Sequence, residues 1–160
     1  MTDITIAPVQ HEVVVPVSQA RAFQLFTTHF DSWWPRAHHI GAAPLHRAVM
    51  EPRVGGRWYE VGVDGSECEW GVVLEWDEPS SFVVTWQLNG RFEYDPDLAH
   101  ASEVAVTFTP TEDGSTLVAM EHRRLERVIA GEDLRKGVDS DGGWSTILRG
   151  FVQLAAASSH

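Results

Sequence analysis

The chain has 160 residues, 43% of them apolar, and its 23 acidic against 12 basic side chains give a formal charge of −11 at pH 7. This length and composition are typical of one globular domain, so we expect residues 1–160 to form a single domain. The negative charge repels phosphate groups, which argues against nucleic acids and anionic membranes as partners. Cys68 is the only cysteine, which excludes an intrachain disulfide bond and zinc sites built on paired cysteines.

The first residues, MTDITIAPVQHEVVV, contain neither a basic segment nor a long apolar run. No stretch of the chain approaches the roughly 18 consecutive apolar residues that a membrane-spanning helix needs. We therefore expect a cytoplasmic protein without a membrane anchor.

The N-terminal part of the chain predicts a strand followed by one or two short helices. Residues 9–15, VQHEVVV, are rich in β-branched side chains. Ser18 is suited to cap a helix, in which Phe23, Phe26 and Phe30 recur at helical spacing.

From Leu45 to Arg124 the apolar period changes to two, which is typical of strands. Glycine, proline and asparagine separate the runs, so the connections are short and the strands form an antiparallel meander. The six predicted strands are 45–51, 56–62, 67–76, 81–88, 102–109 and 115–124. Alternation along 67–76 places five side chains together on its inner face: Cys68, Trp70, Val72, Leu74 and Trp76.

The chain ends in a polar, glycine-containing segment, 125–142, followed by an amphipathic helix. We interpret the segment as a connection or lid, with a short helix at its start. Asp141 is the expected N-cap of the final helix. An apolar stripe runs along that helix: Trp144, Ile147, Leu148, Phe151, Leu154 and Ala155. These elements predict an α+β fold, in which a curved seven-stranded antiparallel sheet wraps around the C-terminal helix and leaves a cavity between them.

Five motifs occur in an order that resembles the START-like (SRPBCC) helix-grip superfamily: VVVPVSQARAFQLFT, EPRVGGRWYEV, GVVLEWDEPSSFVVTWQL, DGSTLVAMEHRRL and GGWSTILRGF. Within it, the chain is most similar to the branch of the C-terminal domain of the activator of the heat-shock-protein-90 ATPase. The resemblance implies the helix-grip fold. Because the superfamily includes ligand carriers, cyclases and co-chaperone domains, it leaves the function open.

The leading hypothesis is binding of a small, mostly apolar or aromatic molecule in the cavity. Tryptophan suits such a pocket because it joins a large apolar ring to one polar handle. No motif for a cofactor is present, and none is expected. The expected ligand-binding residues are Trp58, Trp70, Trp86, Met120, His122, Trp144, Ile147, Gly150 and Phe151.

A cyclase or dehydratase is the first alternative, with Glu60 and His122 as an acid/base pair. We favour separate structural roles for the two residues. His122 is expected to be neutral and bonded to a backbone carbonyl, and Glu60 is expected to reach solvent or an arginine at a strand end. Cys68 lies between Glu67 and Glu69, whose charges raise a thiol pKa and disfavour a reactive thiolate.

A chaperone-associated interaction domain is the second alternative, and it rests on the resemblance alone. The acidic segment 58–90 and the basic segment 123–136 also allow a dipolar surface that faces a partner or the second copy of a homodimer. His29, His38, His39 and His46 lack the spacing of metal ligands, so we interpret their region as a solvated loop beside the cavity mouth.

Gly150 lies in the middle of the final helix, where glycine costs about 1 kcal/mol relative to alanine. Two readings account for it: close packing of the helix on the sheet, or space left for a ligand. We expect the second, because Trp144 and Phe151 already supply bulk nearby.

Overall fold

The computed structural model describes residues 5–158, which contain one antiparallel sheet in the strand order β1-β7-β6-β5-β4-β3-β2. This sheet and the C-terminal helix confirm the predicted α+β helix-grip fold, and each strand lies within two residues of its predicted bounds. The strands are β1 (Val9–Val15), β2 (Leu45–Met50), β3 (Arg57–Gly62), β4 (Glu67–Asp77), β5 (Ser81–Trp86), β6 (Ser102–Pro110) and β7 (Thr116–Arg123).

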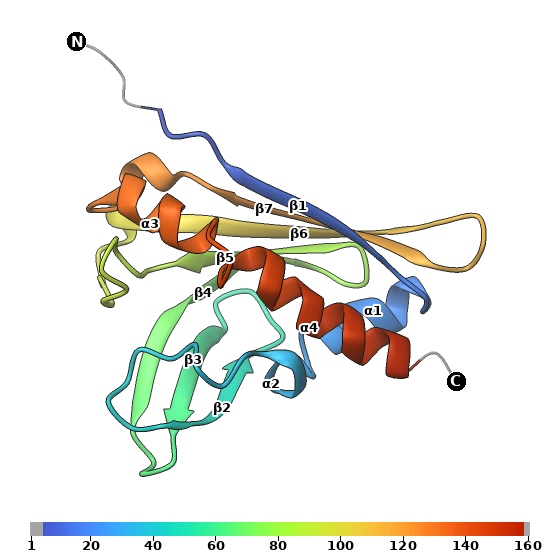
Figure 1. The fold of residues 1–160 in the computed structure, drawn as a ribbon, viewed down its shortest axis with the longest axis horizontal. Helices are drawn as coiled ribbons and strands as arrows, with labels where there is room; N and C mark the ends of the chain where they lie inside the picture. The colour runs from blue at the N-terminus through green and yellow to red at the C-terminus, as the bar shows by residue number, and fades with distance from the viewer. Residues whose placement is uncertain (1–4, 159–160) are drawn as a thin grey trace.

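Two short helices, α1 (Gln19–Phe26) and α2 (Phe30–Trp33), connect β1 at one edge of the sheet to β2 at the other edge (Figure 1). Ser18 caps α1, since its hydroxyl accepts a hydrogen bond from the Arg21 backbone N–H at 3.2 Å. The predicted cap is therefore confirmed, and of the one or two short helices expected here the chain forms two.

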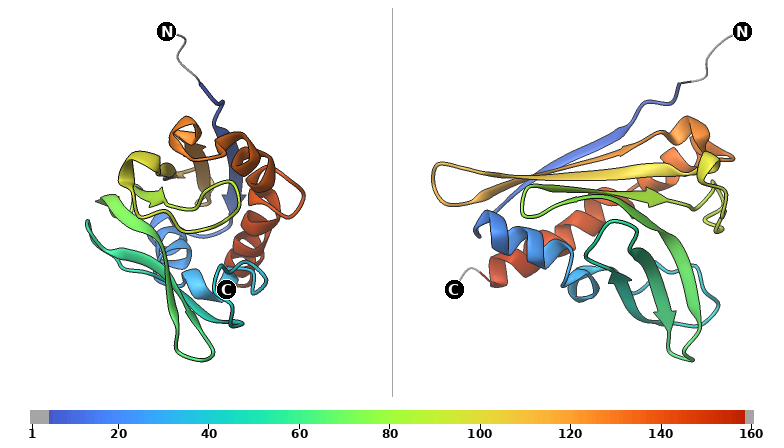
Figure 2. Two further views of the ribbon diagram at one scale, coloured as in Figure 1. Left: turned by 90° about the vertical axis from the view of Figure 1, so that its left-hand side faces the viewer. Right: turned by 180° about the vertical axis from the view of Figure 1, so that it is seen from behind.

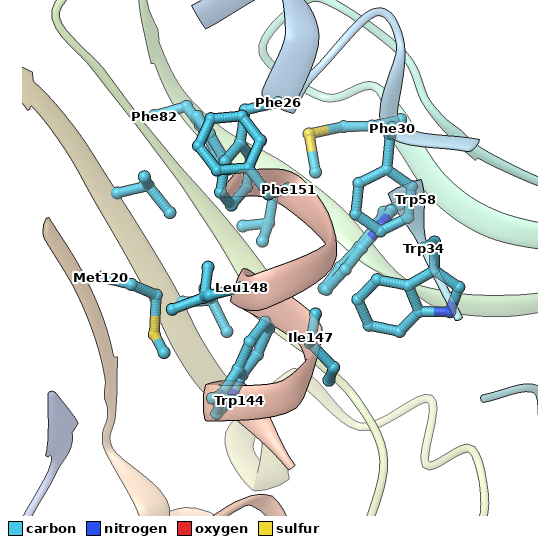
Figure 3. Close-up of a cluster of buried hydrophobic side chains, with 14 of the residues drawn as sticks. Phe26, Phe30, Trp34, Trp58, Phe82, Met120, Trp144, Ile147, Leu148 and Phe151 are labelled. Atoms are coloured by element: carbon cyan, nitrogen blue, oxygen red, sulfur yellow. The ribbon is translucent and has the colours of Figure 1, made fainter. Parts of the chain in front are cut away.

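The last helix, α4 (Trp144–Ala157), runs across the concave side of the curled sheet (Figures 1 and 2). Its side chains fill the interior between Met120 on one side and Phe30, Trp34 and Trp58 on the other (Figure 3). The apolar stripe is buried as predicted, except that Leu154 is only partly covered: Trp144, Ile147, Leu148, Phe151 and Ala155.

The expected cap of α4 was wrong. Gly143 occupies the N-cap position and makes no side-chain capping bond, whereas the Asp141 backbone carbonyl accepts a hydrogen bond from the Thr146 hydroxyl. A Cβ atom at Gly143 would lie 2.0 Å from the Val138 carbonyl oxygen, so the turn into α4 brings two backbone segments too close for any side chain.

Residues 125–142 form the 3₁₀ turn η2 (Leu125–Arg127) and the helix α3 (Gly131–Val138). Leu125, Leu134 and Val138 are buried, so this segment closes one end of the core. A second 3₁₀ turn, η1 (Leu98–His100), precedes β6. None of the helices within residues 5–158 is long and apolar enough to cross a membrane.

Two β-bulges in β4 change the predicted inner face of that strand. The register against β3 skips Trp70, and the register against β5 skips Leu74. As a result Trp70 and Val73 are buried, while Leu74 is 39% exposed, so the strict alternation expected for 67–76 was wrong. A bulge re-aims the side chains on either side of it, and here Val73 points to the interior in place of Leu74.

The space beside Gly150 is occupied by α2. A Cβ atom at Gly150 would lie 2.9 Å from the Trp33 carbonyl oxygen. Gly150 therefore lets two helices approach closely, and the expected cavity at this position is not there.

Replacing Gly150 with alanine should lower the melting temperature. Overpacking typically costs about 1–3 kcal/mol, and better helix propensity offsets about 1 kcal/mol of that loss. Thermal unfolding followed by circular dichroism measures the difference. Gly142→Ala is the matched control, because a Cβ atom there meets nothing within 4 Å. A rise in melting temperature for Gly150→Ala would contradict the close contact.

Candidate functional site

A cavity of about 220 Å³ opens where the α2–β2 loop and the β5–η1 loop meet the inner face of β4 and β5. Its wall is mostly apolar and includes three indole rings, one phenyl ring and two imidazoles. The lining residues are Trp34, Ala37, His38, His39, Ile40, Trp70, Trp86, Leu88 and Phe92.

The aromatic wall is anchored in the hydrophobic core. The Trp34 ring stacks on Phe30 with a centroid distance of 4.8 Å and contacts Trp70 at 5.2 Å. The Trp86 ring packs against Trp58 at 5.8 Å and Trp144 at 5.6 Å. Because each ring is held by others behind it, the wall is rigid before any ligand arrives.

Glu60 holds the loop on one side of the cavity. Its carboxylate accepts hydrogen bonds from the Ile40 N–H at 2.6 Å, the Gly41 N–H at 3.2 Å and Trp70 Nε1 at 2.8 Å. The side chain is only 1% exposed. The expectation that Glu60 reaches solvent or an arginine was therefore wrong, because three N–H donors satisfy the carboxylate inside the protein.

Cys68 lies beside this loop, and its thiol is not suited to nucleophilic chemistry. Burial raises the thiol pKa, and the nearby charges of Glu60, Asp64 and Glu69 raise it further. The thiolate is the reactive form of cysteine, so a raised pKa disfavours reaction.

Two histidines on the cavity wall have defined partners. His38 Nε2 lies 2.8 Å from the Gly142 carbonyl oxygen, and the His38 carbonyl accepts a hydrogen bond from Trp34 Nε1 at 2.8 Å. His39 Nδ1 lies 2.9 Å from the Gly41 carbonyl oxygen. These contacts tie the α2–β2 loop to the segment before α4 and fix both imidazoles.

The opposite side of the cavity depends on a buried polar network beneath the β5–η1 loop. The Thr85 hydroxyl accepts from the Val72 N–H and donates to Gln87 Oε1, both at 2.8 Å. The backbones of Gln87 and Asp95 are bonded at 2.7 Å. The pKa of Asp95 is lowered by a hydrogen bond from the Asp97 N–H and by His100. This network holds the loop that carries Leu88 and Phe92.

His122 is buried behind the aromatic wall and does not line the cavity. Its Nδ1 accepts from Trp144 Nε1 at 3.1 Å, so Nε2 carries the proton of the neutral ring and donates to the Ser102 hydroxyl at 2.8 Å. The Ser102 hydroxyl in turn donates to the Trp86 carbonyl at 3.3 Å. Burial lowers the pKa of His122 to about 3. The predicted neutral state is confirmed, but its partners are side chains rather than a backbone carbonyl.

Glu60 and His122 therefore serve two different hydrogen-bond networks, in agreement with the separate structural roles that we favoured, and the acid/base pair of the cyclase alternative is not assembled. Asp31 is the carboxylate nearest the N-terminal histidines in sequence. It accepts hydrogen bonds from the Arg36 guanidinium and the Ala48 N–H, both at 2.8 Å. Within residues 5–158, no three His, Cys, Asp or Glu side chains are grouped to hold a metal ion.

The expected ligand-binding residues divide into two groups. Trp70 and Trp86 line the cavity. The others contribute to the packed interior around α4: Trp58, Met120, His122, Trp144, Ile147, Gly150 and Phe151. Sequence reasoning missed five lining residues: Trp34, Ala37, Ile40, Leu88 and Phe92. The placement of His38 and His39 beside a cavity mouth agrees with the expectation for that loop.

The titration of His122 predicts acid destabilisation. The folded state holds the pKa near 3, below the ordinary 6.5, so the folded protein binds fewer protons. The contribution of neutral His122 to the free energy of unfolding is complete above about pH 6.5. It falls as the pH decreases, by about 2 kcal/mol between roughly pH 7.5 and pH 5. Urea unfolding at a series of pH values measures this loss, and His122→Gln should show a correspondingly smaller one. The assignment of a neutral, buried His122 would be contradicted if both proteins lost the same free energy of unfolding as the pH fell. A ring that titrates above pH 5 by NMR would also contradict it.

Comparison with proteins of known structure finds the same fold in many chains. An anthrahydroquino-gamma-pyrone synthase, solved as a complex, is 35% identical, with 94% of this chain and 97% of that chain covered and a TM-score of 0.65. The self-sacrificing resistance protein CalC from Micromonospora echinospora is 33% identical, with 94% and 95% covered and a TM-score of 0.70. An Hsp90 activator from Plasmodium falciparum is 19% identical, with 72% and 71% covered and a TM-score of 0.50.

A search of curated protein sequences finds no match. By contrast, the sequence profile described as "Activator of Hsp90 ATPase homolog 1-like protein" matches residues 16–156, which is most of the chain. The match agrees with the helix-grip fold and with the two relatives above 30% identity. The chain belongs to the Activator of Hsp90 ATPase homolog 1-like family.

Proposed function

We propose that this protein binds a small aromatic molecule in the cavity lined by Trp34, Trp70 and Trp86. The observation that carries the proposal is the cavity itself, which has a mostly apolar wall and a volume of about 220 Å³. Apolar pockets with a few polar groups are the usual sites of small-molecule binding. The rings are positioned to stack on a flat ligand because the core already holds them in place.

Two relatives support the same class of function. The synthase and the resistance protein are each above 30% identical over nearly the whole chain, and the name of the synthase implies contact with a small aromatic molecule. The wall of this chain provides ring faces and apolar side chains in place of a charged cluster, so the ligand is expected to be mostly uncharged where it enters the cavity.

Naphthalene and 2-acetylnaphthalene should bind saturably, with one site per chain, and quench part of the tryptophan emission. Isothermal titration calorimetry and fluorescence measure the affinity. Ala37→Phe should weaken binding at least tenfold, because Ala37 lines the cavity and its side chain can grow into it without entering the core.

The matched control is Ala99→Phe, since Ala99 lies on η1, is exposed and does not line the cavity. Equal affinities for wild type, Ala37→Phe and Ala99→Phe would place the probe elsewhere and contradict the proposal. Unsaturable binding by folded wild-type protein would do the same.

Proton-transfer catalysis on an aromatic ketone is a second candidate, favoured by the 35% identity to a synthase and by the histidines on the cavity wall. His39 Nδ1 faces the Gly41 carbonyl and so carries the proton, which leaves the Nε2 lone pair as a base. In this candidate His39 Nε2 removes a proton from the carbon beside the ligand carbonyl, the electron pair moves to the carbonyl oxygen, and the same nitrogen returns a proton to carbon.

Exchange of the acetyl protons of 2-acetylnaphthalene in deuterium oxide tests this candidate by NMR. Catalysis predicts faster exchange with wild-type protein and a loss of the acceleration in His39→Gln. His46→Gln, at an exposed position on β2, is the control. Exchange at the buffer rate with bound ligand would exclude this chemistry and leave the binding function standing.

Contact with an Hsp90 chaperone is suggested by the family description alone. The Hsp90 activator among the structural relatives is 19% identical, a level at which the likeness concerns the fold. Stimulation of the ATPase of purified Hsp90 by the purified protein is the direct measurement for this activity.

A further inference from the structure

The cavity wall contains two buried polar atoms without a hydrogen-bond partner: His38 Nδ1 and Trp86 Nε1. Buried polar groups are nearly always paired, so each exception needs a reason. Both belong to residues that line the same cavity, and an inference about their role rests on the proposed binding function.

The chemistry of His38 Nδ1 follows from the other ring nitrogen. His38 Nε2 lies 2.8 Å from the Gly142 carbonyl oxygen, and a carbonyl oxygen can only accept a hydrogen bond. Nε2 therefore carries the proton of the neutral imidazole, and Nδ1 offers a lone pair. The free atom at His38 is an acceptor and fits a ligand donor.

The chemistry of Trp86 Nε1 is fixed by the indole itself, which can only donate. The side chain is 5% exposed, and its ring is held by His122 at a centroid distance of 5.0 Å and by Trp144 at 5.6 Å. His122 uses both of its nitrogens in bonds to Trp144 and Ser102, so it offers the Trp86 N–H no lone pair. The free atom at Trp86 is a donor and fits a ligand acceptor.

We propose that the ligand is an aromatic molecule that carries both a hydrogen-bond acceptor for Trp86 Nε1 and a hydrogen-bond donor for His38 Nδ1, such as a phenolic ketone. Each nitrogen has less than 1 Å² of solvent-accessible surface, so contact with a ligand requires side chains of the adjoining loops to shift, while the core holds the aromatic rings in place. Pairing these two nitrogens on binding removes the cost of leaving a buried donor and a buried acceptor unpaired.

A matched series of four probes tests the two contacts separately: naphthalene, 2-naphthol with a donor, 2-acetylnaphthalene with an acceptor, and 6-hydroxy-2-acetylnaphthalene with both. Calorimetric titration of the wild-type protein should show that the hydroxyl and the acetyl group each strengthen binding about 3–10-fold, the range expected for one net hydrogen bond. The probe with both groups should bind most tightly.

Two variants assign each gain to its partner. Trp86→Phe keeps an aromatic ring without the N–H and should remove the gain from the acetyl group alone. His38→Gln keeps an N–H donor for the Gly142 carbonyl but lacks the ring acceptor, and should remove the gain from the hydroxyl alone. Trp76→Phe is the control, because Trp76 is partly buried against the core and does not line the cavity.

The outcomes separate this inference from the proposed function. If naphthalene binds in the cavity and all four probes have the same affinity, the donor–acceptor inference is wrong and the binding function stands. If no probe binds, the binding function itself fails. Gains that persist in both Trp86→Phe and His38→Gln would show that other atoms recognise the polar groups, and would also overturn the inference.

Discussion

The cavity depends first on one buried carboxylate. Glu60 lies on β3, yet its three donors come from the α2–β2 loop and from Trp70 on β4. A buried charge without such partners would destabilise the fold, so the loop is bound to the sheet by the need to satisfy it. The Glu60 carboxylate also orients the Trp70 ring. One side chain therefore positions both an aromatic ring and a loop that line the cavity.

The interior of the helix-grip fold is closely packed along most of α4. Phe151 contacts Phe26 and Trp33, with centroid distances of 4.9 and 5.4 Å, and α2 fills the space beside Gly150. The free volume lies instead at the end of the sheet where the α2–β2 and β5–η1 loops meet. Under the proposed function, loop residues packed against the aromatic wall would decide which ligand binds.

The fold was predictable from sequence because periodicity, turn residues and the apolar stripe of α4 all depend on local chemistry. The cavity was only partly predictable, because Trp70 and Trp86 lie on predicted strands, whereas Trp34, Leu88 and Phe92 reach it through tertiary contacts of loops. The β4 bulges shift the side-chain alternation, so simple alternation mispredicted the inner face of that strand. Gly71 was the available signal, since a Cβ atom there would lie 2.0 Å from the Thr85 carbonyl oxygen, and glycine inside a strand often marks a bulge or close backbone approach.

The hydrogen bonds that run from Trp144 through His122 and Ser102 to the Trp86 carbonyl have one direction, because the indole can only donate and the carbonyl can only accept. Four elements, α4, β7, β6 and β5, each supply one member. Loss of any interior member leaves a buried donor or acceptor on both sides of the gap. Residues 86, 102, 122 and 144 are therefore expected to change together in evolution. A relative with an apolar residue in place of His122 is expected to differ at Ser102 and Trp144 as well.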